Sequence, residues 1–427
     1  MRNRFLLSVG LSDLAALLVA MALASEVVFG VLIPWESIEG TEVLPMLGVI
    51  TGAMVLMSVA TAQMSGPGVP RPTYGRMFMI MMGTGMITAT ALVFAREIYF
   101  SRLFLISTGA AWVVLSTAHR IVRRRRPWTE RLLLITAEKE LAEDLAASGN
   151  TDVVSVLRPD FDATPEPPDR DVTIAVDLRS VLSPAVAAYL SSCDMAGYRI
   201  RPFSSRYEYH TGRVPLVHLS EGWEISAPLL EVAPWLPGKR VFDVIVTSLT
   251  LPIWLLMAGG VGAFIRFSSS GPAIFRQERT GLGGRTFTMY KFRTMSEDAE
   301  KDGPRFATAS DPRLIRGGAF LRKSRLDEIP QLWNVLRGDM SLVGPRAEQV
   351  SFAQLFAAEI PFYNHRHLVR PGVTGWAQVS YGYADDKADT IEKLTYDLYY
   401  IKNMSPVMDL KVLWESIWTV LTGDGAR

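Results

Sequence analysis

Asp327 and Glu328 are adjacent carboxylates, and Arg322 and Arg325 lie just upstream of them. Near a helix N-terminus a carboxylate stays ionised, because the free backbone N–H groups and the helix dipole favour negative charge. An ionised Asp can attack phosphorus or hold a divalent metal, while arginines neutralise phosphate oxygens. The alternative is that the two carboxylates cap a solvated first turn. On spacing alone the capping alternative is favoured.

The stretch around these carboxylates predicts one helix over residues 324–337. Ser324 and Asp327 have the spacing of a capping-box variant, and Pro330 falls in the first turn. Gly338 is expected to end the helix. Apolar residues recur at helical spacing and predict a buried stripe made of Leu326, Ile329, Trp333 and Leu336.

Two further motifs flank this stretch. Residues 291–295 (KFRTM) precede it, and residues 370–378 (RPGVTGWAQ) follow it. In this order, and together with residues 324–346, they resemble the bacterial sugar transferase family, the monotopic polyprenyl-phosphate phosphoglycosyl transferases. The resemblance covers the chain from about Lys239 to the C-terminus.

The resemblance implies transfer of a sugar 1-phosphate from a UDP-sugar to polyprenyl (undecaprenyl) phosphate, with release of UMP. This is the priming step of exopolysaccharide, capsule or O-antigen assembly. Asp327 would be the nucleophile of a covalent aspartyl–phosphosugar intermediate, and Mg²⁺ would be held by Asp327 with Glu328. The candidate contacts to the phosphates and the nucleotide are five cations: Lys291, Arg293, Arg322, Arg346 and Arg370.

The composition indicates a membrane protein. Hydrophobic residues make up 49% of the 427 residues, and the mean hydropathy of +0.18 is high for a soluble protein. Four apolar runs predict membrane helices: Phe5–Ile33, Val43–Met64, Met77–Ala95 and Leu103–Ala118. Arginines around these runs place both ends of the bundle in the cytoplasm. The basic run at residues 123–126 is expected to be a juxtamembrane anchor and not a nucleic-acid site.

Three domains are predicted: a four-helix transmembrane bundle (1–126), an α/β module (127–234) and an α+β catalytic domain (235–427). In the module, predicted strands at 131–136, 153–157 and 172–176 alternate with predicted helices at 138–148 and 184–196. The turn at 136–139 lacks the glycines of a dinucleotide fingerprint. We therefore expect a degenerate Rossmann-like module that binds no dinucleotide.

Val241–Phe267 is long enough to span a membrane, but Pro252 near its middle cannot continue a straight helix. Positive charge flanks both sides, at Lys239 and Arg240 before it and Arg266 after it. This pattern predicts a re-entrant helix–break–helix, as the resemblance also implies. The protein is then a multi-pass protein of the bacterial inner membrane with its catalytic domain on the cytoplasmic face, where nucleotide sugars occur.

Other features leave alternatives open. A membrane-tethered nucleotide-sensing or scaffold protein without catalysis would explain the architecture, whereas a dehydratase or dehydrogenase would need the missing fingerprint. Residues 281–284 predict either a hairpin turn or a phosphate loop. The stripe along residues 410–421 predicts a helix in the membrane interface or on the core. His365 and His367 are expected to make surface polar contacts. Because Cys193 is the single cysteine of the sequence, an internal disulfide is excluded. A homodimer is possible.

Overall fold

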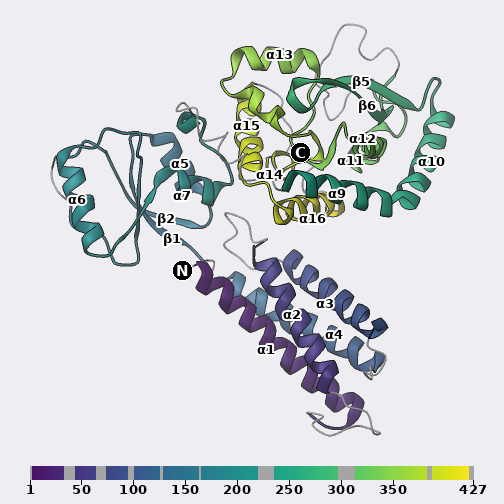
Figure 1. Cartoon of the computed structure of the whole chain (residues 1–427), viewed down its shortest axis with the longest axis horizontal. Helices are drawn as coiled ribbons and strands as arrows, with labels where there is room; N and C mark the ends of the chain where they lie inside the picture. Colours follow the sequence, from purple (N-terminus) through teal and green to yellow (C-terminus); the bar gives the residue numbers. More distant parts are fainter. Residues whose placement is uncertain are drawn as a thin grey trace. The chain divides into compact units, whose positions relative to one another are not determined.

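The computed structural model describes residues 2–32, 44–63, 74–94, 101–125, 128–162, 165–219, 235–296, 313–381 and 387–422. The chain divides into two compact units, Met1–Thr211 and Gly212–Arg427. The first contains the apolar helices and a parallel sheet, and the second contains the Asp–Glu stretch (Figure 1).

Four long helices form the N-terminal bundle: α1 (Arg2–Phe29), α2 (Leu44–Gln63), α3 (Tyr74–Phe94) and α4 (Arg102–Arg124). Three of them contain segments that are long and apolar enough to cross a membrane: Ser8–Phe29, Leu44–Thr61 and Arg102–Arg124. The four predicted apolar runs thus correspond to four helices. Arg71 and Arg126, on which the predicted orientation partly rests, and Arg96, which argues weakly against it, lie outside the described residues.

A buried ion pair joins α1 to α4 inside this bundle. Asp13 and Arg120 are both 0% exposed, and Arg120 donates to Oδ1 at 2.6 Å and to Oδ2 at 2.8 Å. The Ser116 hydroxyl donates to Oδ1 at 2.8 Å, and the Trp112 indole donates to the Asp13 backbone carbonyl. An unpaired charge is costly in apolar surroundings, so this pair fixes the alignment of the two helices.

The α/β module contains a four-stranded parallel sheet of order β2-β1-β3-β4. Its strands are β1 (Glu130–Ile135), β2 (Thr151–Leu157), β3 (Thr173–Val176) and β4 (Arg199–Pro202). Its helices are α5 (Lys139–Ala147), α6 (Pro184–Met195) and α7 (Phe203–Thr211). Side chains of β1 and β3 pack against α6 on one face and against α5 and α7 on the other, which explains their continuous apolar runs. The predicted parallel α/β region is confirmed, and buried Cys193 belongs to its core.

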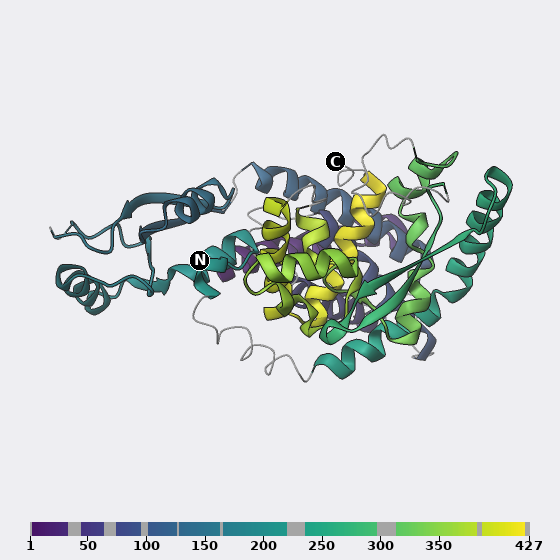
Figure 2. The ribbon, with the colours of Figure 1, turned by 90° about the horizontal axis from the view of Figure 1, so that it is seen from above.

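The second unit begins with two helices, α9 (Trp235–Leu249) and α10 (Leu251–Ser268), followed by the antiparallel hairpin β5 (Ile274–Thr280) and β6 (Thr286–Phe292). Residues 281–284 join the two strands, which supports the hairpin-turn interpretation. Seen from above, the hairpin lies between α10 and the yellow C-terminal helices (Figure 2). Phe292 of β6 packs against Val261 and Ile265 of α10.

The remaining elements follow in chain order and include the Asp–Glu stretch. They are α11 (Gly318–Lys323), the 3₁₀ turn η3 (Leu326–Glu328), α12 (Gln331–Arg337), β7 (Ser341–Val343), α13 (Val350–Glu359), η4 (Tyr363–Leu368), β8 (Gly372–Thr374), α14 (Trp376–Ser380), α15 (Lys387–Lys402) and α16 (Pro406–Thr422). Residues as far back as Val214 join the same core, since the Val214 N–H donates to the Thr395 carbonyl. The compact unit therefore extends before the predicted domain boundary at residue 235.

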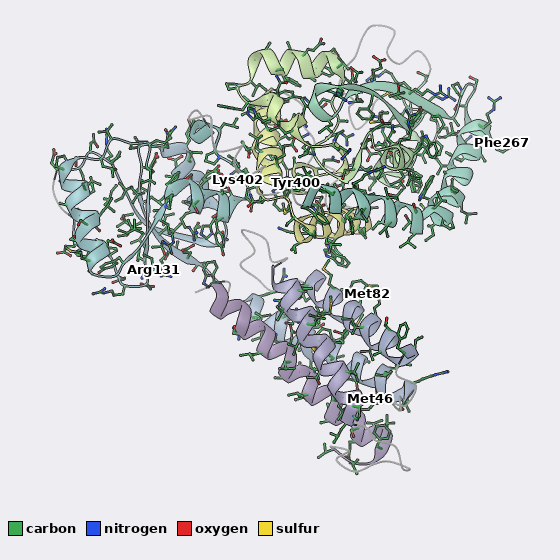
Figure 3. All side chains as sticks on the ribbon, in the orientation of Figure 1. Met46, Met82, Arg131, Phe267, Tyr400 and Lys402 are labelled. Atoms are coloured by element: carbon green, nitrogen blue, oxygen red, sulfur yellow. The ribbon has the colours of Figure 1, made fainter. Side chains whose placement is uncertain are left out.

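The helix is interrupted just before Pro252, so residues 241–267 do not form one continuous helix. α9 ends at Leu249, Thr250 lies between the helices, and Pro252 falls in the first turn of α10. Figure 1 shows α9 and α10 running in different directions. α10 is itself long and apolar enough to cross a membrane, and only 11% of that segment is buried. Phe267, at the far end of α10, points away from the rest of the unit (Figure 3) and is 91% exposed.

Candidate active site

The carboxylates lie on a 3₁₀ turn between two short helices. Ser324 is the C-cap of α11, and its hydroxyl donates to the Phe320 carbonyl, so Ser324 is not an N-cap. Arg325 follows with φ 57°, in the left-handed region that few side chains adopt. The prediction of one helix over 324–337 is therefore wrong at its start, although Gly338 ends α12 with φ 92° as expected.

The predicted buried stripe is also wrong in part. Leu326 and Ile329 pack against the core of α10, but Trp333 is 52% exposed. A 3₁₀ turn has about three residues per turn, whereas an α-helix has about 3.6. The change from η3 to α12 therefore rotates Trp333 away from the face that Leu326 occupies.

Asp327 and Glu328 are both buried, with 8% and 7% exposure, so the interpretation as a solvated capping turn is wrong. Three cations hold Glu328. Lys291 Nζ and Arg346 lie 3.3 Å from Oε1, and Arg325 lies 3.4 Å from Oε2. Asp327 differs, since its buried Oδ1 has no hydrogen-bond partner in the part of the chain that the structure describes.

This arrangement separates the pKa values of the two carboxyls. Burial raises the pKa of Asp327 to about 6, and the negative charge of Glu328 adds to that shift. Burial also acts against ionisation of Glu328, but Lys291, Arg346 and Arg325 outweigh it and lower its pKa to about 2. Burial lowers the pKa of Lys291 to about 8. At neutral pH both carboxylates are charged, and Asp327 is the more basic one.

Backbone-to-backbone packing positions Arg346. A Cβ on Gly344 would lie 2.4 Å from the Arg370 carbonyl oxygen, and a Cβ on Gly372 would lie 2.1 Å from the Gly344 nitrogen. Only glycine allows such a close approach. The loop that follows β7 therefore lies directly against β8, and Arg346 reaches both Glu328 and Gln378 Oε1, the latter at 3.2 Å.

Helix α9 holds the elements on both sides of this loop. The Arg240 guanidinium donates to the carbonyls of Val335 and Leu336, at the end of α12. Asp243 Oδ1 accepts the backbone N–H of Leu342 in β7 at 3.1 Å. The first helix of the predicted re-entrant segment is thus bonded to α12, which follows the carboxylates, and to β7, which leads to Arg346.

The other predicted cations have varied contacts. Arg322 donates to Thr294 Oγ1 at 2.9 Å, and its charge acts on the pKa of Asp327. Arg293 donates to Ser269 Oγ, just after α10. Arg370 donates to the Gly338 carbonyl. Lys291, Arg322 and Arg346 thus lie around the carboxylates, while these contacts direct Arg293 towards α10 and Arg370 towards the end of α12.

Comparison with known proteins identifies the family to which the chain belongs. The family model for bacterial sugar transferases matches residues 235–423. A UDP-glucose:undecaprenyl-phosphate glucose-1-phosphate transferase of Caulobacter vibrioides is 42% identical over 209 residues, 47% of this chain and 76% of that one. An exopolysaccharide production protein of Rhizobium leguminosarum bv. phaseoli is 37% identical over 190 residues, 43% of this chain and 95% of that one. The chain belongs to the bacterial sugar transferase family.

A longer alignment includes residues before the family region. The UDP-N-acetylgalactosamine-undecaprenyl-phosphate N-acetylgalactosaminephosphotransferase of Aeromonas hydrophila is 42% identical over 270 residues. The alignment covers 59% of this chain and 62% of the relative. The chain therefore spans less than two thirds of that relative's length.

The residues around the carboxylates fit a magnesium ion through Asp327. Among the described residues there is no group of three or more His, Cys, Asp or Glu side chains that could hold a metal by itself. Mg²⁺ commonly takes one or two carboxylates together with substrate phosphates. The buried Asp327 Oδ1 without a partner suits that role, whereas both oxygens of Glu328 already face cations.

Sequence reasoning missed several buried polar side chains near the carboxylates. His367 is buried within η4 and not on the surface as predicted, and the neighbouring Arg366 pairs with Asp397 at 2.8 Å. Arg366 also donates to the Arg346 carbonyl and so helps to hold the loop that carries Arg346. Gln331 is buried as well, and its position four residues after Asp327, one helical turn on, is a signal that could have identified it.

Proposed function

We propose that this chain transfers a sugar 1-phosphate from a UDP-sugar to polyprenyl phosphate, releasing UMP and forming polyprenyl-diphosphate-sugar. The observation that carries the proposal is Asp327 Oδ1, a buried carboxylate oxygen without a partner beside cations suited to phosphate. The names of relatives 37–42% identical, which mention UDP-sugars, undecaprenyl phosphate and exopolysaccharide, support it.

The proposed chemistry has two displacements at one phosphorus. An Asp327 oxygen attacks the β-phosphorus, the bond between this phosphorus and the bridging oxygen breaks, and UMP leaves with the electron pair. An oxygen of polyprenyl phosphate then attacks the same phosphorus and releases the Asp327 carboxylate. Two steps through a covalent intermediate replace one difficult displacement. Lys291 and Arg346 would neutralise the phosphoryl oxygens, and Arg322 would add positive charge near the nucleophile.

Release of UMP by the purified full-length protein tests this function. The protein in detergent is mixed with undecaprenyl phosphate and, in turn, with UDP-glucose, UDP-galactose and their N-acetylated forms. We expect UMP and a lipid-linked sugar diphosphate with at least one donor. Binding of the nucleotides without UMP release from any of them would instead support the sensing or scaffold alternative.

We further propose that Asp327 would hold a Mg²⁺ ion that accompanies the donor's diphosphate, whereas Glu328, the second predicted ligand, pairs with cations through both of its oxygens. A bound divalent ion would neutralise charge on the diphosphate and the leaving UMP. Asp327 then has two tasks, as ligand and as nucleophile, which its two oxygens can divide. Excess chelator should abolish UMP release and added Mg²⁺ should restore it. Full activity in chelator would contradict the metal proposal.

For the membrane, we propose that α9 and α10 form a re-entrant segment in one leaflet of the bacterial inner membrane, with the catalytic unit on the cytoplasmic face. The break before Pro252 and the positive flanks support this. Exposed apolar residues on both helices support it too: Val241, Ile245, Leu249, Ile253, Leu256, Phe264 and Phe267. On α16, Leu410, Ile417 and Trp418 are exposed and fit the interfacial alternative.

Cysteine accessibility tests this topology. In a Cys193→Ser background, single cysteines replace Pro237 and Arg285, two exposed positions on either side of the segment. A membrane-impermeant thiol reagent should label both only after the cells are opened. Labelling of the position-285 cysteine alone in intact cells would mean that α9–α10 crosses the membrane.

We also propose that the α/β module is a degenerate Rossmann-like domain that binds no dinucleotide. At the carboxyl ends of β1 and β3, where such ligands bind, Thr136 Oγ1 donates to buried Asp177 and accepts the backbone N–H of Glu138. Acidic side chains there disfavour a pyrophosphate. Absence of NAD or NADP binding by calorimetry is the expected result.

A further inference from the structure

Gln331 is the first residue of α12, and its side-chain amide has an unmet hydrogen-bonding need. The residue is 3% exposed, and its Nε2 has no hydrogen-bond partner among the described residues. Buried side-chain amides are nearly always bonded, so an exception calls for an explanation. A donor held dry and without a partner is suited to an acceptor that arrives with a ligand.

Gln331 lies close to the carboxylates in the chain. Ile329 and Pro330 keep right-handed helical backbone angles between η3 and α12. Gln331 thus begins α12 four residues after Asp327 and three after Glu328. It also lines a small hollow together with Lys291 and Arg346, whose apolar walls are Met289, Met340 and Ala347.

Each polar side chain that lines this hollow carries a hydrogen-bond donor: an ammonium, a guanidinium and an amide N–H. The acidic partner of the two cations is Glu328, whose Oε1 lies 3.3 Å from Lys291 Nζ and from Arg346. A lining of donors between methionine walls favours an oxygen that only accepts hydrogen bonds. A non-bridging phosphate oxygen is such an atom, and donors aimed at it stabilise phosphoryl-transfer transition states.

We propose that Gln331 is a further substrate-binding residue, whose amide N–H donates to a non-bridging oxygen of the phosphoryl group that Asp327 attacks. Lys291 and Arg346 bind the same group, and the three donors act together. This inference rests on the proposed function, because it takes the transferred phosphoryl group to lie beside Asp327. It adds a neutral donor to the predicted set of cations.

The test is Gln331→Met in the full-length protein, with Gln354→Met as its matched control. Methionine has nearly the same length and no N–H, and Gln354 is exposed on α13. Loss of a hydrogen bond to a charged group should lower kcat/KM for UMP release by about 10- to 100-fold. The Tm should stay unchanged or rise, because the amide donor has no partner in the free protein. The control should change neither quantity.

Two results would overturn the inference. Activity of Gln331→Met equal to that of the control would show that the amide does not contact the reacting group. A parallel fall in Tm and activity would show that the amide stabilises the fold, for instance through an ordered water.

A failure of the proposed function itself looks different, because then the wild-type protein releases no UMP. In that case the rise in Tm caused by inorganic pyrophosphate is compared between wild type and Gln331→Met. A smaller rise in the variant supports a phosphate contact, and an equal rise refutes it.

Discussion

Asp13 in the N-terminal bundle and Asp327 in the second unit are both buried carboxylates near an arginine, yet their surroundings differ. Both oxygens of Asp13 are bonded, to Arg120 and Ser116, and the side chain is 0% exposed. At Asp327 the nearby cations pair instead with Glu328, and one carboxylate oxygen has no partner among the residues described.

The difference shows that burial alone does not identify a reactive carboxylate. A fully bonded carboxylate such as Asp13 has no oxygen available for a ligand, and its hydrogen bonds stabilise one alignment of α1 and α4. Asp327 carries the desolvation penalty without hydrogen bonds on Oδ1 to offset it, which is why burial raises its pKa. Such a group destabilises the free protein and can gain free energy when a metal or phosphorus arrives.

The largest contrast is expected from Asp327→Asn. The amide cannot act as the nucleophile, so UMP release should fall by at least about 1,000-fold. The Tm should not fall, because a buried negative charge is removed at a position where Oδ1 has no partner. The measurements are UMP release and thermal melting of the purified protein. Turnover within about tenfold of wild type would remove Asp327 from the nucleophile's role.

Asp13→Asn should show the reverse pattern. Removal of one partner leaves Arg120 buried and without its counter-ion, which typically costs about 3–5 kcal/mol. We expect earlier thermal unfolding of the full-length protein, while UMP release per folded molecule stays within about twofold of wild type. Asp13→Asn melting like wild type would mean that the pair contributes little to the bundle. Strong loss of turnover would couple the bundle to catalysis.

A smaller effect is expected from pH. As pH falls through about 6, Asp327 gains a proton and loses its nucleophilic form, so at pH 5 kcat/KM should be about a tenth of its maximum. As pH rises through about 8, Lys291 loses its charge, and activity should decline again. Initial rates between pH 5 and 9 give the profile. An acid limb near pH 4 would show that Asp327 has an ordinary carboxyl pKa during turnover.

The smallest effect on chemistry is expected when the first unit is removed. A chain that begins at Gly212 retains every proposed catalytic residue and should release UMP at a rate within about twofold of wild type. A chain that begins at residue 235 should melt earlier, because it lacks buried Val214 and the Gly212 carbonyl that accepts the Trp376 indole N–H. Inactivity of a well-folded chain from Gly212 would assign a catalytic role to the first unit.

Local patterns in the sequence determined much of the architecture. The apolar runs, the short strands of the module and the glycine at the end of α12 each depend on neighbours a few residues away. The order of the motifs along the chain was enough to predict the family and to single out the Asp–Glu pair. Local periodicity failed where backbone geometry changes along the chain, as at Arg325, whose left-handed conformation separates α11 from η3.

Only the tertiary structure decided which cations surround the carboxylates and which oxygen stays without a partner. Lys291 and Arg346 are 37 and 18 residues from Glu328 in the sequence. Asn334 of α12 binds β6 through the Tyr290 N–H and the Thr288 carbonyl, which holds Lys291 beside Glu328. Such contacts depend on how separate elements pack. The sequence therefore specified the chemical groups of the site, and long-range packing set their burial, their pairing and hence their pKa values.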